Sequence, residues 1–357
     1  MKKALIAMSG GVDSSAAVWL MKEKGYDCMG VTMKLHEEMG EEACRIGKTC
    51  CSLDDVEDAR SVAVRLGIPY HVFNFKEDFE KQVIGRFIHA YEIGATPNPC
   101  IDCNRYLKFE RLYQRAKELG YDIIVTGHYA RIEQDPDTGR WLLKKGMDAQ
   151  KDQSYVLYQL TQEQLAHICL PLGIYTKPEI REIAEKLELR NAHKAESQDI
   201  CFVPDGDYAA FIRRHTGKEY PPGNFVDAQG KVLGRHKGLI HYTVGQRRGL
   251  GIAAPEPYYV CEKRYATNEI VLGTATELLV NEFQVSDLNW IAIADLTEPR
   301  KVMMRTRYHQ KEFEATLFPC TDDRVRVVSS NPVQRPAPGQ AAVFYDGDVV
   351  VGGGVIQ

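Results

Sequence analysis

Residues 9–15 (SGGVDSS) combine two glycines, three hydroxyl side chains and one carboxylate in a single short segment. The segment follows an apolar run over residues 4–8, which is typical of a buried parallel strand, and it precedes a helical pattern of apolar residues. Glycines let a backbone approach an anion closely, and the N–H groups at a helix N-terminus point toward it. The strand, the turn and the helix start therefore predict a phosphate cradle, to which Ser14 or Ser15 can add hydroxyl donors.

The composition of this loop narrows the kind of phosphate chemistry. No Gly-Lys-Ser/Thr follows, so the loop is not a Walker A sequence and carries no lysine that would reach a γ-phosphate. Asp13 would instead suit a magnesium ion held against pyrophosphate. A lone Gly-Gly is more often an ordinary turn between a strand and a helix. The whole string, however, resembles the PP-loop of the ATP pyrophosphatases, which split ATP into AMP and pyrophosphate.

Two further segments carry cysteines beside polar residues, namely residues 96–104 (TPNPCIDCN) and 196–202 (ESQDICF). Two prolines and two asparagines predict that the first is a loop just before a helix, where the helix dipole favours a thiolate. Cys100 and Cys103 form a Cys-x-x-Cys pair, which is compatible with a redox couple, half a zinc site or part of an iron–sulfur site. A thiolation reaction would need only one thiol from each segment to meet over an activated atom.

The remaining cysteines and the overall composition indicate an ordinary globular protein. Cys44, Cys50 and Cys51 lie together, but no histidine or fourth cysteine stands at a standard zinc spacing, so we expect no metal there. No segment approaches the roughly 18 consecutive apolar residues that cross a membrane, and the first strand leaves no room for a signal peptide. We therefore expect a cytoplasmic protein, in which ten cysteines serve thiol chemistry or metal binding more than a disulfide framework.

Charge is distributed unevenly along the chain. The formal net charge is −4, which is unusual for a protein that binds nucleic acid. From Arg213 to Arg248, however, the sequence contains eight lysines and arginines and only two acidic residues, Glu219 and Asp227, which gives a local charge of +6. A clustered basic surface can bind phosphates despite an acidic total.

The order of the expected elements predicts the fold class. Strands at residues 4–8, 27–33, 71–75 and 122–126 alternate with helices at 53–66, 79–93 and 105–119, which predicts an α/β fold with a doubly wound parallel sheet. We assign residues 1–204 to this domain. Short strands and tight turns then predict a small, mostly-β central domain over residues 205–276, and regularly spaced strands predict a C-terminal β-barrel over residues 277–357.

Taken together, the motifs resemble the tRNA-specific 2-thiouridylases over nearly the whole chain. Besides the three segments above, the resemblance rests on GHYAR at residues 127–131, KDQSYVL at 151–157 and HYTVGQRRGLGI at 241–252. It implies that ATP, with Mg²⁺, adenylylates the C2 oxygen of the wobble uridine of tRNA, and that persulfide sulfur replaces this oxygen. The implied partners are tRNAs for lysine, glutamate and glutamine, and a sulfur-relay carrier or cysteine desulfurase.

The resemblance also assigns roles to individual residues. Cys103 would be the nucleophile, Cys201 the persulfide carrier, and Asp102 a group for acid–base chemistry. The residues implied to bind ATP are Ala7, Met8, Ser9, Gly10, Gly11, Val12, Asp13, Ser14, Met33 and Gly127. The residues implied to contact tRNA are Asn98, Pro99, Cys100, His128, Lys151, Asp152, Gln153, Arg307, Tyr308 and Gln340.

Three other interpretations remain open. A PP-loop synthetase or amidotransferase acting on a small molecule explains the loop, but neither the paired cysteines nor the basic segment. An RNA-binding module without catalysis predicts that Cys201→Ser leaves function intact. Cysteine at position 100 departs from the pattern of some family members. With Cys103 and Cys201 it could supply three ligands to an iron–sulfur cluster, which would replace the persulfide route.

Overall fold

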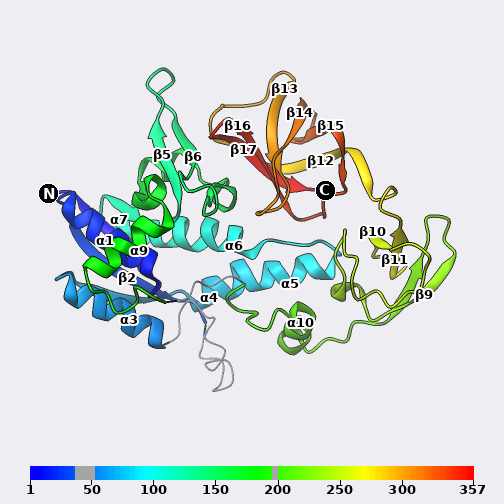
Figure 1. Cartoon of the computed structure of the whole chain (residues 1–357), viewed down its shortest axis with the longest axis horizontal. Helices are drawn as coiled ribbons and strands as arrows, with labels where there is room; N and C mark the ends of the chain where they lie inside the picture. The colour runs from blue at the N-terminus through cyan, green and yellow to red at the C-terminus, as the bar shows by residue number, and fades with distance from the viewer. Residues whose placement is uncertain (37–52, 195–199) are drawn as a thin grey trace. The chain divides into compact units, whose positions relative to one another are not determined.

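The computed structural model describes residues 1–36, 53–194 and 200–357, which divide into two compact units. Unit 1 comprises Met1–Ile84, Cys100–Pro204 and Gly347–Val351, and unit 2 comprises Gly85–Pro99, Asp205–Asp346 and Gly352–Gln357. Figure 1 follows the chain from blue to red. These units differ from the three domain ranges expected from the sequence, which stay a prediction.

Unit 1 is built on a five-stranded parallel sheet with the strand order β3-β2-β1-β4-β7. The strands are β1 (Lys3–Ala7), β2 (Asp27–Lys34), β3 (Tyr70–Asn74), β4 (Ile123–Val125) and β7 (Ile168–Cys169). The chain runs outward from β1 to β3 and then returns to place β4 on the other side of β1. Because crossovers between parallel strands are right-handed, the connecting helices change faces there. The doubly wound sheet predicted from the sequence is confirmed.

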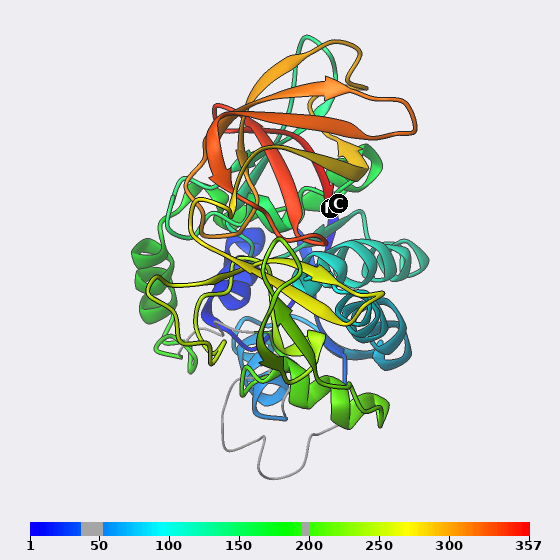
Figure 2. The same ribbon diagram turned by 90° about the vertical axis from the view of Figure 1, so that its right-hand side faces the viewer.

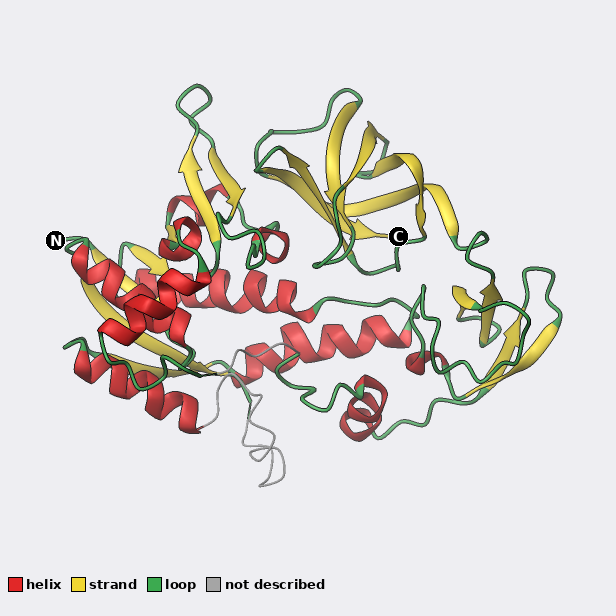
Figure 3. Cartoon of the chain, in the orientation of Figure 1, coloured by secondary structure: helices red, strands yellow, loops and turns green. Residues whose placement is uncertain are grey.

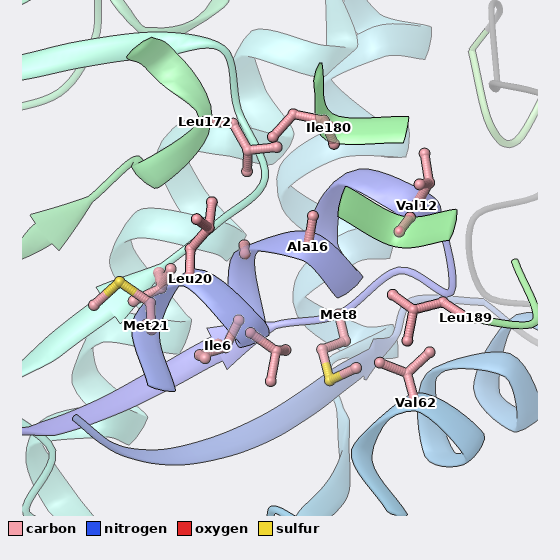
Figure 4. Close-up of a cluster of buried hydrophobic side chains, with 14 of the residues drawn as sticks. Ile6, Met8, Val12, Ala16, Leu20, Met21, Val62, Leu172, Ile180 and Leu189 are labelled. Atoms are coloured by element: carbon pink, nitrogen blue, oxygen red, sulfur yellow. The ribbon is translucent and has the colours of Figure 1, made fainter. Parts of the chain in front are cut away.

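One face of this sheet is covered by α1 (Val12–Glu23), α3 (Leu53–Arg65) and α9 (Lys177–Lys186). Ile6 and Met8 share a buried cluster with residues of all three helices, as Figure 4 shows. Leu5 is equally buried but points to the opposite face, since successive side chains of a strand alternate. The short apolar run at the N-terminus thus forms a strand that is covered on both faces.

The chain between β3 and β4 is mostly helical. It forms α4 (Lys76–Phe79), η1 (Glu80–Ile84), α5 (Gly85–Glu92), α6 (Pro99–Asp102), η2 (Cys103–Arg111) and α7 (Leu112–Glu118), of which η1 and η2 are π-helical. The prediction of a loop over residues 96–104 is wrong from Pro99 onward, so Cys100 and Cys103 lie in helices. Proline is tolerated here because the first helical position needs no N–H donor and suits its fixed φ.

A hairpin that the sequence analysis did not predict follows β4. It pairs β5 (Ala130–Gln134) with β6 (Trp141–Lys145), and Val349 of the C-terminal strand pairs with Lys144 of β6. Three short helical segments then lead toward α9, namely η3 (Ser154–Leu157), α8 (Gln162–Ala166) and η4 (Pro171–Ile174).

The small central part of unit 2 is a sheet with one α-helix and one short 3-10 helix. Its strand order is β10-β11-β8-β9, formed by β8 (Gly223–Val226), β9 (Val232–His236), β10 (Tyr259–Arg264) and β11 (Glu269–Gly273), with η5 (Leu239–His241) after β9. The helix α10 (Tyr208–Thr216) packs on α5, where the Phe87 ring lies 6.0 Å from Tyr208 and 6.3 Å from Phe211 between centroids. The expected short strands are confirmed, whereas α10 was not expected.

The C-terminal part of the chain forms the predicted barrel. The strand order is β12-β15-β14-β13-β16-β17, and β12 also pairs with β17, which closes the ring. The strands are β12 (Leu279–Trp290), β13 (Arg300–Arg305), β14 (Phe313–Pro319), β15 (Val325–Gln334), β16 (Ala341–Asp346) and β17 (Val349–Ile356). Figures 2 and 3 show these strands curving around one another and joined by loops. Across the described ranges of the chain, no helix is long and apolar enough to span a bilayer.

Candidate functional site

The loop between β1 and α1 is held by its own hydroxyl groups and by α3. Ser14 Oγ donates to the Gly11 carbonyl oxygen (3.0 Å) and accepts from the Ser9 N–H (3.2 Å). Gly10 has a φ of +72°, and a Cβ at this position would lie 2.5 Å from the Asp55 carbonyl oxygen. Glycine is therefore required at position 10 by the backbone conformation and by the close approach to α3.

The loops that follow β1 and β4 touch at the carboxyl edge of the sheet. A Cβ on Gly127 would lie 2.9 Å from both the Asp13 carbonyl carbon and the Ser14 nitrogen, so this approach requires glycine. Met33 is half-buried near the end of β2. Ligands of open parallel sheets bind at this edge, beside the reversal of strand order, which here falls between β1 and β4. Ala7, Met8 and Val12 flank the same loop at the end of β1 and the start of α1.

The Asp13 carboxylate lies at the centre of a hydrogen-bond network. Lys177 Nζ lies 2.7 Å from Asp13 Oδ1 and 2.8 Å from Oδ2, and the Tyr129 hydroxyl donates to Oδ1 at 2.7 Å. The Lys177 residue is only 6% exposed. Sequence reasoning missed Lys177 and Tyr129. One signal was available for Lys177, because a cation at the first position of a helix opposes the helix dipole and is unusual without a local reason.

Two of the residues assigned to tRNA by resemblance, Asp152 and Gln153, make hydrogen bonds that hold the backbone next to this network. Gln153 Oε1 accepts from the Tyr129 N–H, and the Gln153 N–H donates to the Tyr129 carbonyl oxygen, both at 2.9 Å. Asp152 is buried, and its Oδ1 accepts from the N–H groups of Gly146 (3.2 Å) and Ser154 (3.0 Å). Lys151 precedes them and is half-buried. The KDQ segment therefore fixes Tyr129, which in turn contacts Asp13.

His128, also assigned to tRNA, is a buried side chain in this structure. Its Nδ1 lies 2.7 Å from Thr126 Oγ1, and its ring centroid lies 5.8 Å from that of Phe109. Burial lowers the pKa of His128 well below its ordinary value, and the nearby Lys108 acts in the same direction. The folded protein thus holds this imidazole in the neutral form.

Acidification is expected to destabilise the wild-type protein more than a His128→Gln variant. Below pH 6.5, the ordinary pKa of histidine, His128 becomes protonated in the unfolded chain but stays neutral in the folded protein. The resulting loss of stability reaches up to about 1.4 kcal/mol per pH unit until the folded-state pKa is reached. Urea unfolding at about pH 7.5 and about pH 5.5 measures the difference. Equal pH dependence of the unfolding free energies of the wild type and the His128→Gln variant would refute the prediction.

The two cysteines of the proposed thiol chemistry belong to unit 1. Cys103 is the first residue of η2 and is half-buried, and the next residue, Asn104, donates from Nδ2 to the Val156 carbonyl oxygen (3.1 Å). Cys201 lies in a turn that the Phe202 ring anchors on Phe79 of α4, at 5.7 Å between centroids. The helix η2 also packs on α4 and η1. The segments that carry Cys103 and Cys201 therefore both contact α4.

The other thiols have different settings. Cys100 is exposed in the first turn of α6, where the helix dipole acts most strongly, whereas Cys103 follows the last residue of α6, Asp102. No disulfide joins any of the seven cysteines in the described ranges. Within those ranges no three His, Cys, Asp or Glu side chains form a metal-binding group, so Cys100, Cys103 and Cys201 are not arranged as one. Cys44, Cys50 and Cys51, and residues 195–199, lie outside the described residues.

The remaining residues assigned to tRNA belong to unit 2. Gln340 Nε2 donates to the Thr96 carbonyl oxygen (2.8 Å), close in sequence to Asn98 and Pro99. The Arg307 guanidinium lies 2.9 Å from the position of a Cβ on Gly245, so it borders the glycine-rich basic turn. Tyr308 stacks edge-on against His309, at 4.5 Å between centroids. Arg247 and residues 249–252 of the same turn line a surface hollow of about 320 Å³.

Three family models cover nearly the whole chain. Residues 2–205 match the tRNA methyl transferase HUP domain, residues 209–274 the tRNA methyl transferase PRC-barrel domain, and residues 280–356 the aminomethyltransferase beta-barrel domain. The chain is 51% identical to a tRNA-specific 2-thiouridylase MnmA of Acetivibrio thermocellus, covering 100% of this chain and 99% of that protein. It is 48% identical to the protein of the same name from Clostridioides difficile, covering 100% and 98%.

Solved structures resemble the chain only weakly. An NMN synthetase from Francisella tularensis aligns with a TM-score of 0.34 and 16% identity, over 61% of this chain and 78% of that one. A likeness of this size carries no argument about function.

Proposed function

The chain belongs to the family of tRNA-specific 2-thiouridylases, and we propose that it replaces the C2 oxygen of the wobble uridine of tRNA with sulfur. ATP first adenylylates the oxygen, and sulfur from a cysteine persulfide then displaces AMP. The observation that carries the proposal is that one compact unit contains the loop around Asp13 as well as Cys103 and Cys201.

Adenylylation is assigned to the loop at the carboxyl edge of the sheet. The uracil oxygen attacks the α-phosphorus of ATP, pyrophosphate leaves, and AMP becomes the group that sulfur can displace. The N–H groups at the start of α1 and the glycine-containing turn bind phosphates, while Met33 and Gly127 border the adenosine. The Asp13 carboxylate fits Mg²⁺, which commonly binds one or two carboxylates together with phosphate oxygens. When bound there, Mg²⁺ would neutralise charge on the leaving pyrophosphate.

Sulfur transfer is assigned to Cys201 and Cys103. The terminal sulfur of the Cys201 persulfide attacks C2, and the bond from C2 to the AMP oxygen breaks. The Cys103 thiolate then attacks the Cys201 sulfur, which forms a Cys103–Cys201 disulfide and leaves the terminal sulfur on C2. If Cys103 instead releases hydrosulfide before the attack, the same disulfide results. Asp102, beside Cys103, is proposed to accept a proton during these steps.

Each turnover then requires outside reactants and access to the base. A two-electron reductant must restore both thiols, and a persulfide-bearing carrier or a cysteine desulfurase must reload Cys201. The wobble base must leave the anticodon stack, and we assign its surroundings to Asn98, Pro99 and Cys100. The basic turn beside Arg307 would bind the tRNA backbone. We place the reaction in the cytoplasm, where ATP and tRNAs for lysine, glutamate and glutamine occur together.

Reconstitution tests the proposal directly. The protein is incubated with ATP, magnesium, a sulfur donor, a reductant and unmodified tRNA, and the digested RNA is analysed by mass spectrometry for 2-thiouridine. We expect one sulfur-for-oxygen exchange at the wobble uridine and none in a tRNA that carries cytidine there. AMP and pyrophosphate produced without tRNA would favour a small-molecule synthetase. A digest that contains no thionucleoside would overturn the proposal.

A further inference from the structure

Lys263 has an unusual environment for a lysine. It belongs to β10 in unit 2 and is half-buried, and its stem packs against the chain after α5, where a Cβ on Gly94 would lie 3.8 Å from Cβ and Cε of Lys263. Its Nζ atom lies 5.9 Å from the centroid of the Tyr91 ring. Among the described residues Lys263 forms no ion pair, and its Nζ donates only to the Tyr242 carbonyl oxygen, at 3.0 Å.

An ammonium group is costly in this environment. Burial lowers the pKa of Lys263 to about 8, and no charged group in the described part of the chain adds to this effect. Methionine has a similar length and would fill the same space without the desolvation of a charge. Packing alone therefore predicts no need for an amino group at position 263, whereas the hydrogen bond to Tyr242 requires one.

The Tyr242 carbonyl lies where the chain enters the basic turn, which comprises residues 243–252. The strand β10 also holds the base of this turn. The Gly245 N–H donates to the Val260 carbonyl oxygen (2.8 Å), and the Val260 N–H donates to the Gln246 carbonyl oxygen (3.0 Å). The contact from Lys263 extends this attachment to the residue that precedes the turn.

The basic turn presents two exposed arginines, Arg247 and Arg248. The Gln246 side chain supports them, because its Oε1 accepts from the Thr243 N–H (3.0 Å) and its Nε2 donates to the Arg248 carbonyl oxygen (2.9 Å). Within the part of the chain that the structure describes, neither arginine side chain takes part in an ion pair. Both guanidinium groups are thus available to phosphates, on a backbone that is fixed from below.

We propose that Lys263 is a positioning residue for tRNA binding, which holds the start of the basic turn so that Arg247 and Arg248 meet the tRNA backbone. The ammonium group acts from inside the domain and does not contact RNA. Without it the Tyr242 peptide loses its partner, and the turn must be ordered at the expense of binding free energy. The inference rests on the proposed binding of tRNA and identifies an internal group on which this surface depends.

Lys263→Met tests the inference, because methionine keeps the length of the stem and removes the donor. Binding of unmodified tRNA is measured by fluorescence anisotropy at one fixed salt concentration, since phosphate contacts depend on salt. We expect the variant to bind tRNA about 10-fold more weakly, which corresponds to the loss of one charged hydrogen bond. The matched control is Lys301→Met, which removes the same charge from an exposed position on β13 and should keep the wild-type affinity.

A double-variant comparison separates positioning from direct contact. Arg247→Gln/Arg248→Gln removes the charges of the turn, and Lys263→Met is then added to this background. If Lys263 acts through the turn, the added change alters the remaining affinity by less than about twofold. If Lys263 contacts phosphate itself, the added change weakens binding by about 10-fold again and the inference fails.

Two further measurements exclude a merely structural role. In 2-thiouridine formation Lys263→Met should raise KM for tRNA about 10-fold and leave kcat unchanged, because a loss of uniform binding has this signature. Urea unfolding should show no loss of stability, since a desolvated charge has been removed. A variant that unfolds at lower urea, or that loses kcat instead, would contradict the inference. A wild type that does not bind tRNA would overturn the proposed function as well, whereas equal affinities of wild type and Lys263→Met would overturn this inference alone.

Discussion

Replacing Cys201 with serine is expected to abolish 2-thiouridine formation and to leave tRNA-dependent release of pyrophosphate from ATP intact. Serine cannot carry a persulfide, so no sulfur reaches C2, whereas the loop at Asp13 is unchanged. The expected loss is at least about 1,000-fold, as when an enzyme loses its nucleophile. The thionucleoside is measured by mass spectrometry and pyrophosphate by a coupled assay on the same samples.

Two other cysteines serve as controls for this result. Cys320→Ser alters an exposed thiol of unit 2 and should retain full activity. Cys100→Ser separates the persulfide route from an iron–sulfur cluster, because a cluster held by three cysteines would fail without it. We expect this variant to keep most of its activity. The mechanism would be contradicted if the Cys201→Ser variant still formed 2-thiouridine. It would also be contradicted if the Cys100→Ser variant lost thiolation activity although its Cys201 still carried a persulfide.

Replacing Gly10 with alanine is expected to weaken the affinity for ATP by at least about 100-fold. The new Cβ would lie 2.5 Å from the Asp55 carbonyl oxygen and 2.8 Å from Asp55 Cα, so the loop must move away from α3. The φ of +72° adds a strain of about 1–2 kcal/mol for a residue with a Cβ. Displacing the loop moves the N–H groups that would bind phosphate.

Gly25→Ala is the matched control for this prediction. Gly25 has a φ of +78°, but a Cβ there would have no atom within 4 Å. It therefore carries the same backbone strain without the collision. Urea unfolding should show a further loss of about 1–3 kcal/mol for Gly10→Ala, as for overpacking. Calorimetry should show normal ATP binding only for Gly25→Ala, and equal affinities for the two variants would refute the role given to the turn.

The fold class followed from local patterns in the sequence. Apolar runs alternating with helical periodicity predict a parallel sheet because each strand must be covered on both faces, and Leu5 and Ile6 meet that condition on opposite sides of β1. The closed barrel followed likewise from evenly spaced strands. Helix boundaries were less accurate, because the prolines before Cys100 permit a helix start as readily as a loop.

The sequence by itself determined the chemistry of each motif, since a glycine turn, a carboxylate or a thiol keeps its character wherever the chain takes it. Only the tertiary structure decided which of these groups meet. Lys177 contacts Asp13 although the two residues are 164 positions apart in the sequence, and no local periodicity predicts such a contact. Burial likewise turned His128 and Asp152 into internal partners of Thr126 and Ser154. The physical reason is that ion pairing and desolvation depend on neighbours in space, which local sequence patterns do not specify.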